Sequence, residues 1–159
     1  MTEPRKWALI LGASSGFGAA TARRLAVAGW DILGVHLDRR GTLPAVDALR
    51  ADIAAAGRSV ELFNGNAASD DFRRATVQAI EAILQAQGGR IGLLMHSLAF
   101  GTLIDLVPNG TQKAVNRKQL EMTMDVMANS LVYWTQDVVA AGIMGPGRIF
   151  AMTSEGSEK

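Results

Sequence analysis

The chain is organised around the stretch Trp7-Ala-Leu-Ile-Leu-Gly-Ala-Ser-Ser-Gly-Phe-Gly18. Its first five residues form an unbroken apolar run, which is typical of a parallel strand covered on both faces. Three glycines then follow with the spacing G-x-x-x-G-x-G, and an Ala-, Leu- and Arg-rich run from Ala19 to Ala28 ends at Gly29. The pattern predicts a buried strand, a tight turn and a helix.

A helix that begins directly after a glycine turn offers a site for an anion. Its first N–H groups have no partner inside the helix, and the positive end of its dipole points outward. We therefore expect this turn to hold a pyrophosphate, although an ordinary strand-to-helix turn is the simpler alternative. The candidate binding residues are Gly12, Ser14, Ser15, Gly16, Phe17 and Gly18.

This stretch resembles the T-G-x-x-x-G-x-G motif of the short-chain dehydrogenase/reductase family, with Leu11 in the place of the usual Thr. It differs from the G-x-G-x-x-G spacing of the common dinucleotide fingerprint. The resemblance implies an NAD(P)-dependent oxidoreductase with a Rossmann fold. Its α/β architecture would be a doubly wound parallel sheet with strand order 3-2-1-4-5.

The rest of the chain alternates strands and helices, as such a sheet requires. We expect residues 1–159 to form one dinucleotide-binding domain. In the last predicted helix, five apolar residues lie on or near one stripe: Leu120, Met124, Met127, Leu131 and Trp134. The predicted strands are Trp7–Leu11, Asp31–His36, Val60–Phe63, Ile91–His96 and Arg148–Met152; the predicted helices are Ala19–Ala28, Pro44–Ala56, the segment from Ser69 to about Gln87, and Lys118–Ala141.

The composition of the chain argues against several classes of binding site. The 159 residues carry 16 basic and 15 acidic side chains, for a net charge of +1, so no basic field suggests nucleic acid or a membrane surface. The chain has no cysteine, which excludes disulfides and thiolate metal sites, and we expect no metal. Without a signal-peptide pattern or a long apolar span, we expect a cytoplasmic protein.

The loop after the second predicted strand bears on the cofactor. The position at which the family usually has an acid falls on His36, and Asp38 follows two residues later, before Arg39 and Arg40. The run resembles a subset of NADH-dependent enoyl reductases and implicates Leu37, Asp38 and Arg39. An Asp disfavours a 2′-phosphate, whereas arginines favour one or are merely solvated. NAD(H) and NADP(H) both remain open, with a slight preference for NADH.

The next two strand ends supply further candidates by resemblance. Asn66 and Ala67 stand near the Asp-Val pair with which the family holds adenine, although a simple Asn-Gly turn is nearly as plausible. His96-Ser-Leu-Ala-Phe-Gly101 resembles the enoyl-acyl-carrier-protein reductase branch. That resemblance implies that the backbone of Ser97, Leu98 and Ala99 lines the nicotinamide ribose and that Phe100 borders an acyl pocket. We expect His96 itself to be structural.

Two positions concern catalysis. Met127 stands where ketoreductases of the family have an Asn, and Ser154 aligns with the family's catalytic Ser. The family's Tyr and Lys follow about a dozen or more residues beyond that Ser, whereas this sequence ends at Lys159 and its one tyrosine is Tyr133. The resemblance therefore covers the N-terminal three-fifths of a family member, without the C-terminal strands and helices. We expect this chain to bind cofactor with little or no turnover.

Three functions remain open at this point. The first is reduction of an enoyl thioester, as in fatty acid biosynthesis. The second is reduction of a 3-oxoacyl or other carbonyl substrate, and the third is nucleotide binding without catalysis. By resemblance, we also expect a homo-oligomer, a dimer or tetramer formed through the helix of residues 117–141.

Overall fold

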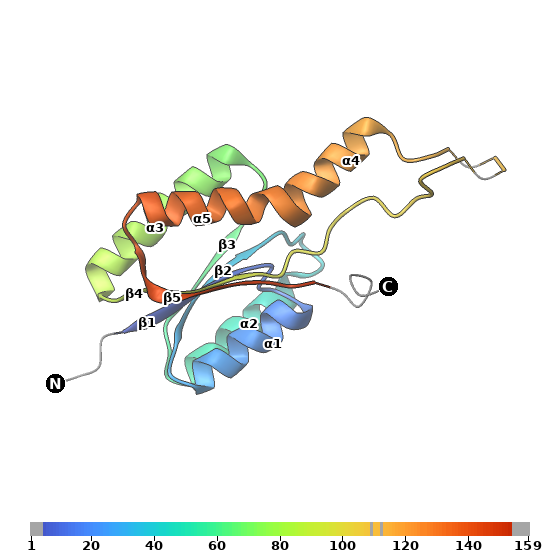
Figure 1. Ribbon diagram of the computed structural model, residues 1–159. Helices are drawn as coiled ribbons and strands as arrows, with labels where there is room; N and C mark the ends of the chain where they lie inside the picture. The colour runs from blue at the N-terminus through green and yellow to red at the C-terminus, as the bar shows by residue number, and fades with distance from the viewer. Residues whose placement is uncertain (1–4, 109, 112, 154–159) are drawn as a thin grey trace.

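The computed structural model describes residues 5–108, 110–111 and 113–153. Its five strands form one parallel sheet in the order β3-β2-β1-β4-β5, as predicted (Figure 1). The strands are β1 (Lys6–Leu11), β2 (Asp31–His36), β3 (Val60–Asn64), β4 (Arg90–His96) and β5 (Met144–Ala151). The helices are α1 (Gly16–Val27), α2 (Leu43–Ala55), α3 (Asp70–Gln87), α4 (Arg117–Met124), η1 (Asp125–Asn129) and α5 (Ser130–Ala140).

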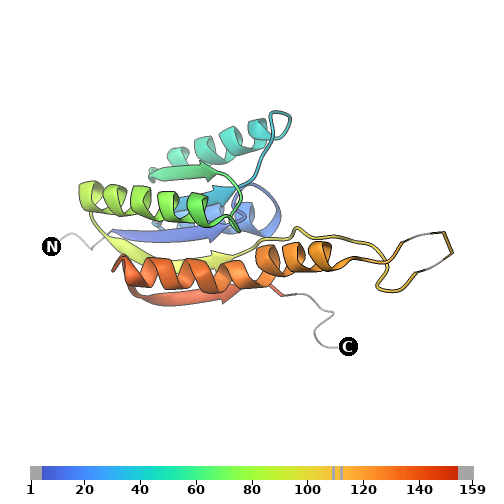
Figure 2. The ribbon, with the colours of Figure 1, turned by 90° about the horizontal axis from the view of Figure 1, so that it is seen from above.

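Helices cover both faces of the sheet, with α1 and α2 on one side and α3 and α5 on the other (Figures 1 and 2). Successive residues of β1 therefore enter different cores. Trp7, Leu9 and Leu11 join the cluster under α3 and α5, whereas Ala8 and Ile10 join the cluster under α1 and α2. All five are fully buried. This two-sided burial explains why the strand is apolar throughout rather than alternating.

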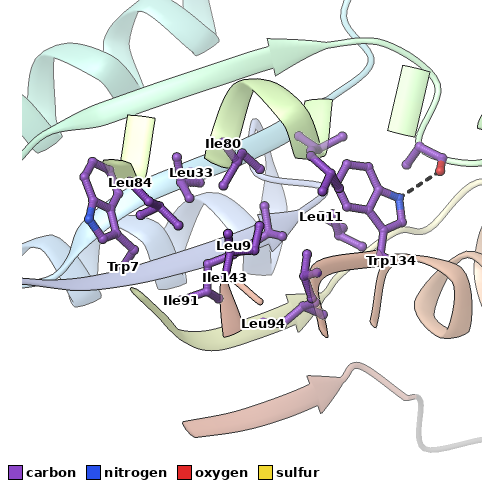
Figure 3. Close-up of a cluster of buried hydrophobic side chains, with 14 residues drawn as sticks. Trp7, Leu9, Leu11, Leu33, Ile80, Leu84, Ile91, Leu94, Trp134 and Ile143 are labelled. Carbon is purple, nitrogen blue, oxygen red and sulfur yellow. Dashed lines mark hydrogen bonds between the residues drawn. The ribbon is translucent and has the colours of Figure 1, made fainter. Parts of the chain in front are cut away.

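Two tryptophans lie at opposite ends of the core under α3 and α5 (Figure 3). Both are fully buried, and both use the indole N–H. Trp7 donates to the carbonyl of Gly88 at 3.0 Å, and Trp134 donates to the carbonyl of Ala67 at 2.9 Å. The second bond ties α5 to the loop after β3, which is one of the loops at the carboxyl edge of the sheet.

The predicted start of the last strand was wrong. We expected Gly142–Gly147 to be a connector, but β5 begins at Met144, and a register shift separates the pairs Ile91–Met144 and Leu93–Arg148. The glycines allow close pairing here, because a Cβ on Gly147 would lie 2.0 Å from the carbonyl oxygen of Gly92. The Gly-Pro-Gly composition that resembles a loop is therefore an irregular stretch of strand.

The last predicted helix is interrupted, and only the last two residues of its apolar stripe, Leu131 and Trp134, contact the core. The π-helical turn η1 separates α4 from α5. Leu120 and Met124 are 45% and 54% exposed, because α4 extends past the carboxyl end of the strands, where no sheet lies beneath it (Figure 2). Met127, in η1, is 45% exposed. Of the predicted stripe only Trp134 is fully buried, and it continues a row spaced by four residues: Val126, Ser130, Trp134 and Val138. None of the described helices is long and apolar enough to cross a membrane.

An ion cluster closes the amino edge of the sheet. The Asp31 carboxylate, which is inaccessible to solvent, accepts bonds from Arg5 at 2.8 Å, Arg58 at 2.7 Å and the backbone N–H of Ser59 at 2.8 Å. Burial raises the pKa of Asp31, but the bonds from Arg5 and Ser59 and the two positive charges outweigh it and hold the pKa below 3.8. The cluster thus stabilises the fold in the ionised form of Asp31.

Replacing Asp31→Asn should lower the free energy of unfolding at pH 7 by about 2 kcal/mol, since it removes hydrogen bonds to a charged acceptor. A lowered pKa contributes stability that is complete above the ordinary value of 3.8 and is lost as the pH falls below it. Urea unfolding between pH 7 and pH 3 measures both effects. The control is Asp52→Asn, because Asp52 pairs with Arg23 on the surface, both about half exposed. An equal loss in both variants would contradict the assignment.

Candidate cofactor-binding site

Backbone hydrogen bonds join the strand ends at the carboxyl edge of the sheet. They bring four of the loops singled out from the sequence into contact with their neighbours, so the candidate residues share one edge, as they do in doubly wound sheets. The bonds run from Gly12 and Ala13 to Val35, from Gly65 to His36, from Ser97 to Leu11, and from Met152 to His96.

Two glycines of the turn are required by close packing. Gly12 has a φ of +88°, and a Cβ there would lie 2.4 Å from the carbonyl oxygen of Ser97. A Cβ on Gly18 would lie 1.9 Å from the carbonyl oxygen of Gly12. Neither position admits a side chain without backbone movement. The start of α1 is therefore held against both the turn and the end of β4.

Gly16 is different, because a Cβ there would meet nothing within 4 Å, although its φ is +51°. The neighbouring N-cap, Ser15, makes no side-chain capping bond, and the first turn of α1 has no acidic residue. The first N–H groups of α1 thus keep the capacity to bind an external anion. Phe17, in the same turn, is 71% exposed. An open, uncapped and uncharged helix start fits a diphosphate.

The loop after β2 meets this turn through Asp38. Burial raises the pKa of Asp38, but hydrogen bonds from Ser14, Thr42 and His36 outweigh it and hold the pKa below its usual value. The carboxylate is therefore ionised and lies beside the turn. Leu37 and Arg39, the other candidates from this loop, are exposed.

The loop after β3 is a turn closed by its own side chain. The side-chain oxygen Oδ1 of Asn66 accepts a hydrogen bond from the backbone N–H of Ala68 at 3.0 Å. Ala67 is buried, and its carbonyl accepts the Trp134 bond described above. The structure places both residues at the carboxyl edge, and no contact to a base follows from it.

The loop after β4 begins at the site and then leaves it. Ser97 packs against Gly12, and Leu98 packs against the core under α3 and α5. Ala99 and Phe100 are exposed, the latter by 60%. Beyond them the segment projects away from the sheet together with α4 (Figure 2). Phe100 is thus available to a ligand, although no described residue encloses it.

His96 has a structural role, as expected. It is buried, and its Nε2 lies 2.8 Å from the Ser130 hydroxyl, which in turn donates to the carbonyl of Val126 at 2.8 Å. Burial lowers the pKa of His96, so the ring is neutral at pH 7. These bonds fasten the π-helical turn to the end of β4 and satisfy the carbonyl of Val126 within that turn.

Ser154, the one catalytic candidate, lies outside the described residues. Asn64, whose side chain binds the backbone N–H and carbonyl of Asp38, was not among the predicted residues, because an Asn before a Gly indicates only a turn. Within the described ranges, no group of three His, Asp or Glu side chains could hold a metal ion.

A family model described as short chain dehydrogenase matches residues 6–159. The chain belongs to the short-chain dehydrogenase family. No curated protein matches the chain, but solved structures do. One is a short-chain dehydrogenase/reductase from Serratia marcescens, with 22% identity, a TM-score of 0.79, and coverage of 97% of this chain and 57% of that one.

Two other solved structures carry a cofactor in their description. A 3-oxoacyl-[acyl-carrier protein] reductase from Brucella melitensis in complex with NAD has 26% identity and a TM-score of 0.75, over 99% of this chain and 59% of that one. A blue fluorescent protein from a metagenomic library in complex with NADPH has 26% identity and a TM-score of 0.79, over 97% and 57%. The chain thus spans less than three-fifths of the length of each of these three structures.

The glycine turn gives a direct prediction. Gly16→Ala should remain folded, at a cost of about 1–2 kcal/mol for a side chain at positive φ. Its methyl group would project into the open space before α1, so NADH affinity should fall roughly tenfold or more through lost bonds to a charged ligand. Calorimetric titration with NADH measures this.

The matched control is Gly29→Ala. Gly29 also has a positive φ, +89°, and open space around its Cβ position, but it lies at the other end of α1. This variant should show a similar stability loss with unchanged NADH affinity. Equal affinities in the two variants would mean that the space beside Gly16 is not the binding site.

Proposed function

We propose that the protein containing this chain is an NAD(P)H-dependent oxidoreductase that reduces an enoyl thioester. The observation that carries the oxidoreductase assignment is the open, uncapped start of α1, in a chain of the short-chain dehydrogenase family. When bound, a reduced nicotinamide dinucleotide would supply a hydride to the β-carbon of the enoyl group and be oxidised, and a proton taken up at the α-carbon would complete the reduction. The amides that open α1 would bind the diphosphate of the dinucleotide, and Asp38 would accept a hydrogen bond from a ribose hydroxyl.

The enoyl substrate is supported by the residues that follow β4 and by Met127. The backbone of Ser97 to Ala99 lines the nicotinamide ribose, and exposed Phe100 borders the acyl chain. Met127, half exposed in the π-helical turn, offers a thioether, which cannot order a proton-relay water as an amide does. Ser154, in the position of the family's catalytic Ser, would donate a hydrogen bond to the thioester oxygen as charge develops there.

A ketoreductase acting on 3-oxoacyl or other carbonyl substrates is the second candidate. It is favoured by the likeness to the Brucella melitensis 3-oxoacyl-[acyl-carrier protein] reductase, which has 26% identity. In that reaction, the hydrogen bond from Ser154 would go to the ketone oxygen.

We also propose that the protein forms a homo-oligomer through the helix of residues 117–141. The support is a set of apolar side chains on this helix that are at least 45% exposed: Leu120, Met124, Met127, Val132 and Val139. A second copy of the same surface would bury them symmetrically.

Assay of the longest natural form of the protein distinguishes the functions. We expect NADH oxidation with crotonyl thioester to exceed that with acetoacetyl thioester in kcat/KM by about tenfold or more. The reverse order would favour the ketoreductase. Cofactor binding with neither substrate turned over would indicate a non-catalytic nucleotide-binding module, and no binding of either reduced cofactor would contradict the oxidoreductase altogether.

A further inference from the structure

The end of β2 holds a carboxylate in an unusual way. The last strand residue, His36, is buried, with a side chain only 3% exposed. Its Nδ1 lies 2.9 Å from Oδ2 of Asp38, two residues later. A carboxylate only accepts, so Nδ1 carries the proton and donates. In extended backbone, residues i and i+2 point to the same side, and the ring of His36 therefore lies behind the carboxylate and supports it.

The backbone of Asp38 is held from the neighbouring strand. Asn64, the last residue of β3, accepts from the N–H of Asp38 and donates to its carbonyl, both at 3.0 Å. The carboxylate also meets Ser14 in the glycine turn, and its side chain is 12% exposed. Main chain and side chain of Asp38 are thus both fixed, from β2, from β3 and from the turn.

We propose that His36 and Asn64 are positioning residues for cofactor selection. They hold Asp38 so that its carboxylate accepts a hydrogen bond from the 2′-hydroxyl of the adenosine ribose and repels a 2′-phosphate. This inference rests on the proposed cofactor site and deepens it, because it names the side chains that hold Asp38 in place and so set the NADH preference expected from the sequence.

The two neighbouring arginines oppose this preference weakly. Arg39 and Arg40 are exposed, and within the described part of the chain neither guanidinium joins an ion pair or a side-chain hydrogen bond. Solvated charges on long side chains must be ordered before they bind a phosphate, and salt screens them. The Asp38 carboxylate is already fixed and mostly buried, so it needs no such ordering. Its repulsion of a 2′-phosphate therefore determines the preference for NADH.

The test is calorimetric titration with NADH and with NADPH of the wild-type chain and three variants. The wild type should bind NADH roughly tenfold or more tightly than NADPH. Asp38→Asn should remove that preference, mainly by tighter NADPH binding. His36→Leu, which lacks the donor, should lose part of it, whereas His36→Asn, which keeps an N–H donor, should restore it.

Asp47→Asn is the control, because it removes the same charge from an exposed position on α2, and it should keep the wild-type ratio. If His36→Leu fails to fold by circular dichroism, Asn64→Ala replaces it, since Asn64 is exposed, and it should lower the ratio likewise. A wild-type preference for NADPH, or an unchanged ratio in the folded positioning variants, overturns the inference and leaves cofactor binding intact. Binding of neither cofactor by the wild type overturns the proposed function and the inference with it.

Discussion

The contact between Gly18 and the carbonyl of Gly12 is the constraint on which the carboxyl edge depends. A Cβ at position 18 would lie 1.9 Å from that oxygen, so α1 reaches this depth only because no side chain intervenes. The same turn abuts Ser97 through Gly12 and reaches Asp38 through Ser14. One close backbone approach therefore fixes the start of α1 relative to β2 and β4, and with it the direction of the free amides.

The two edges of the sheet differ in how far their polar groups are satisfied by the protein itself. At the amino edge, the Asp31 carboxylate accepts hydrogen bonds from Arg5, Arg58 and Ser59. The indole N–H of Trp7 donates to the carbonyl of Gly88. At the carboxyl edge, the start of α1 is uncapped and Gly16 faces open space. Satisfied polar groups stabilise the fold, whereas groups left with capacity are available to a ligand. Asp38 combines both properties, because hydrogen bonds from the protein hold it in place and it still lies beside the glycine turn.

Much of the architecture follows from local pattern, and the exceptions have physical causes. Apolar runs and glycine breaks predict the alternation of strands and helices, because burial on two faces leaves a plain signal in the sequence, whereas the strand order was implied only by the family resemblance. The start of β5 was missed, since Gly145-Pro146-Gly147 has the composition of a loop while pairing with β4. The π-helical turn depends on the bonds among His96, Ser130 and Val126, which join segments over thirty residues apart. The Asn64 clamp on Asp38 is likewise a tertiary contact that no spacing rule predicts.

The central claim is that the amides opening α1 bind a diphosphate. Its most direct test is the ¹H–¹⁵N spectrum of the chain titrated with NADH and, separately, with ADP. The account predicts that the amide resonances of Gly16, Phe17 and Gly18 shift with both ligands, while those of Gly29 and Gly57, at the far ends of α1 and α2, stay in place. Shifts confined to other parts of the chain, or none at saturating ligand, would contradict it.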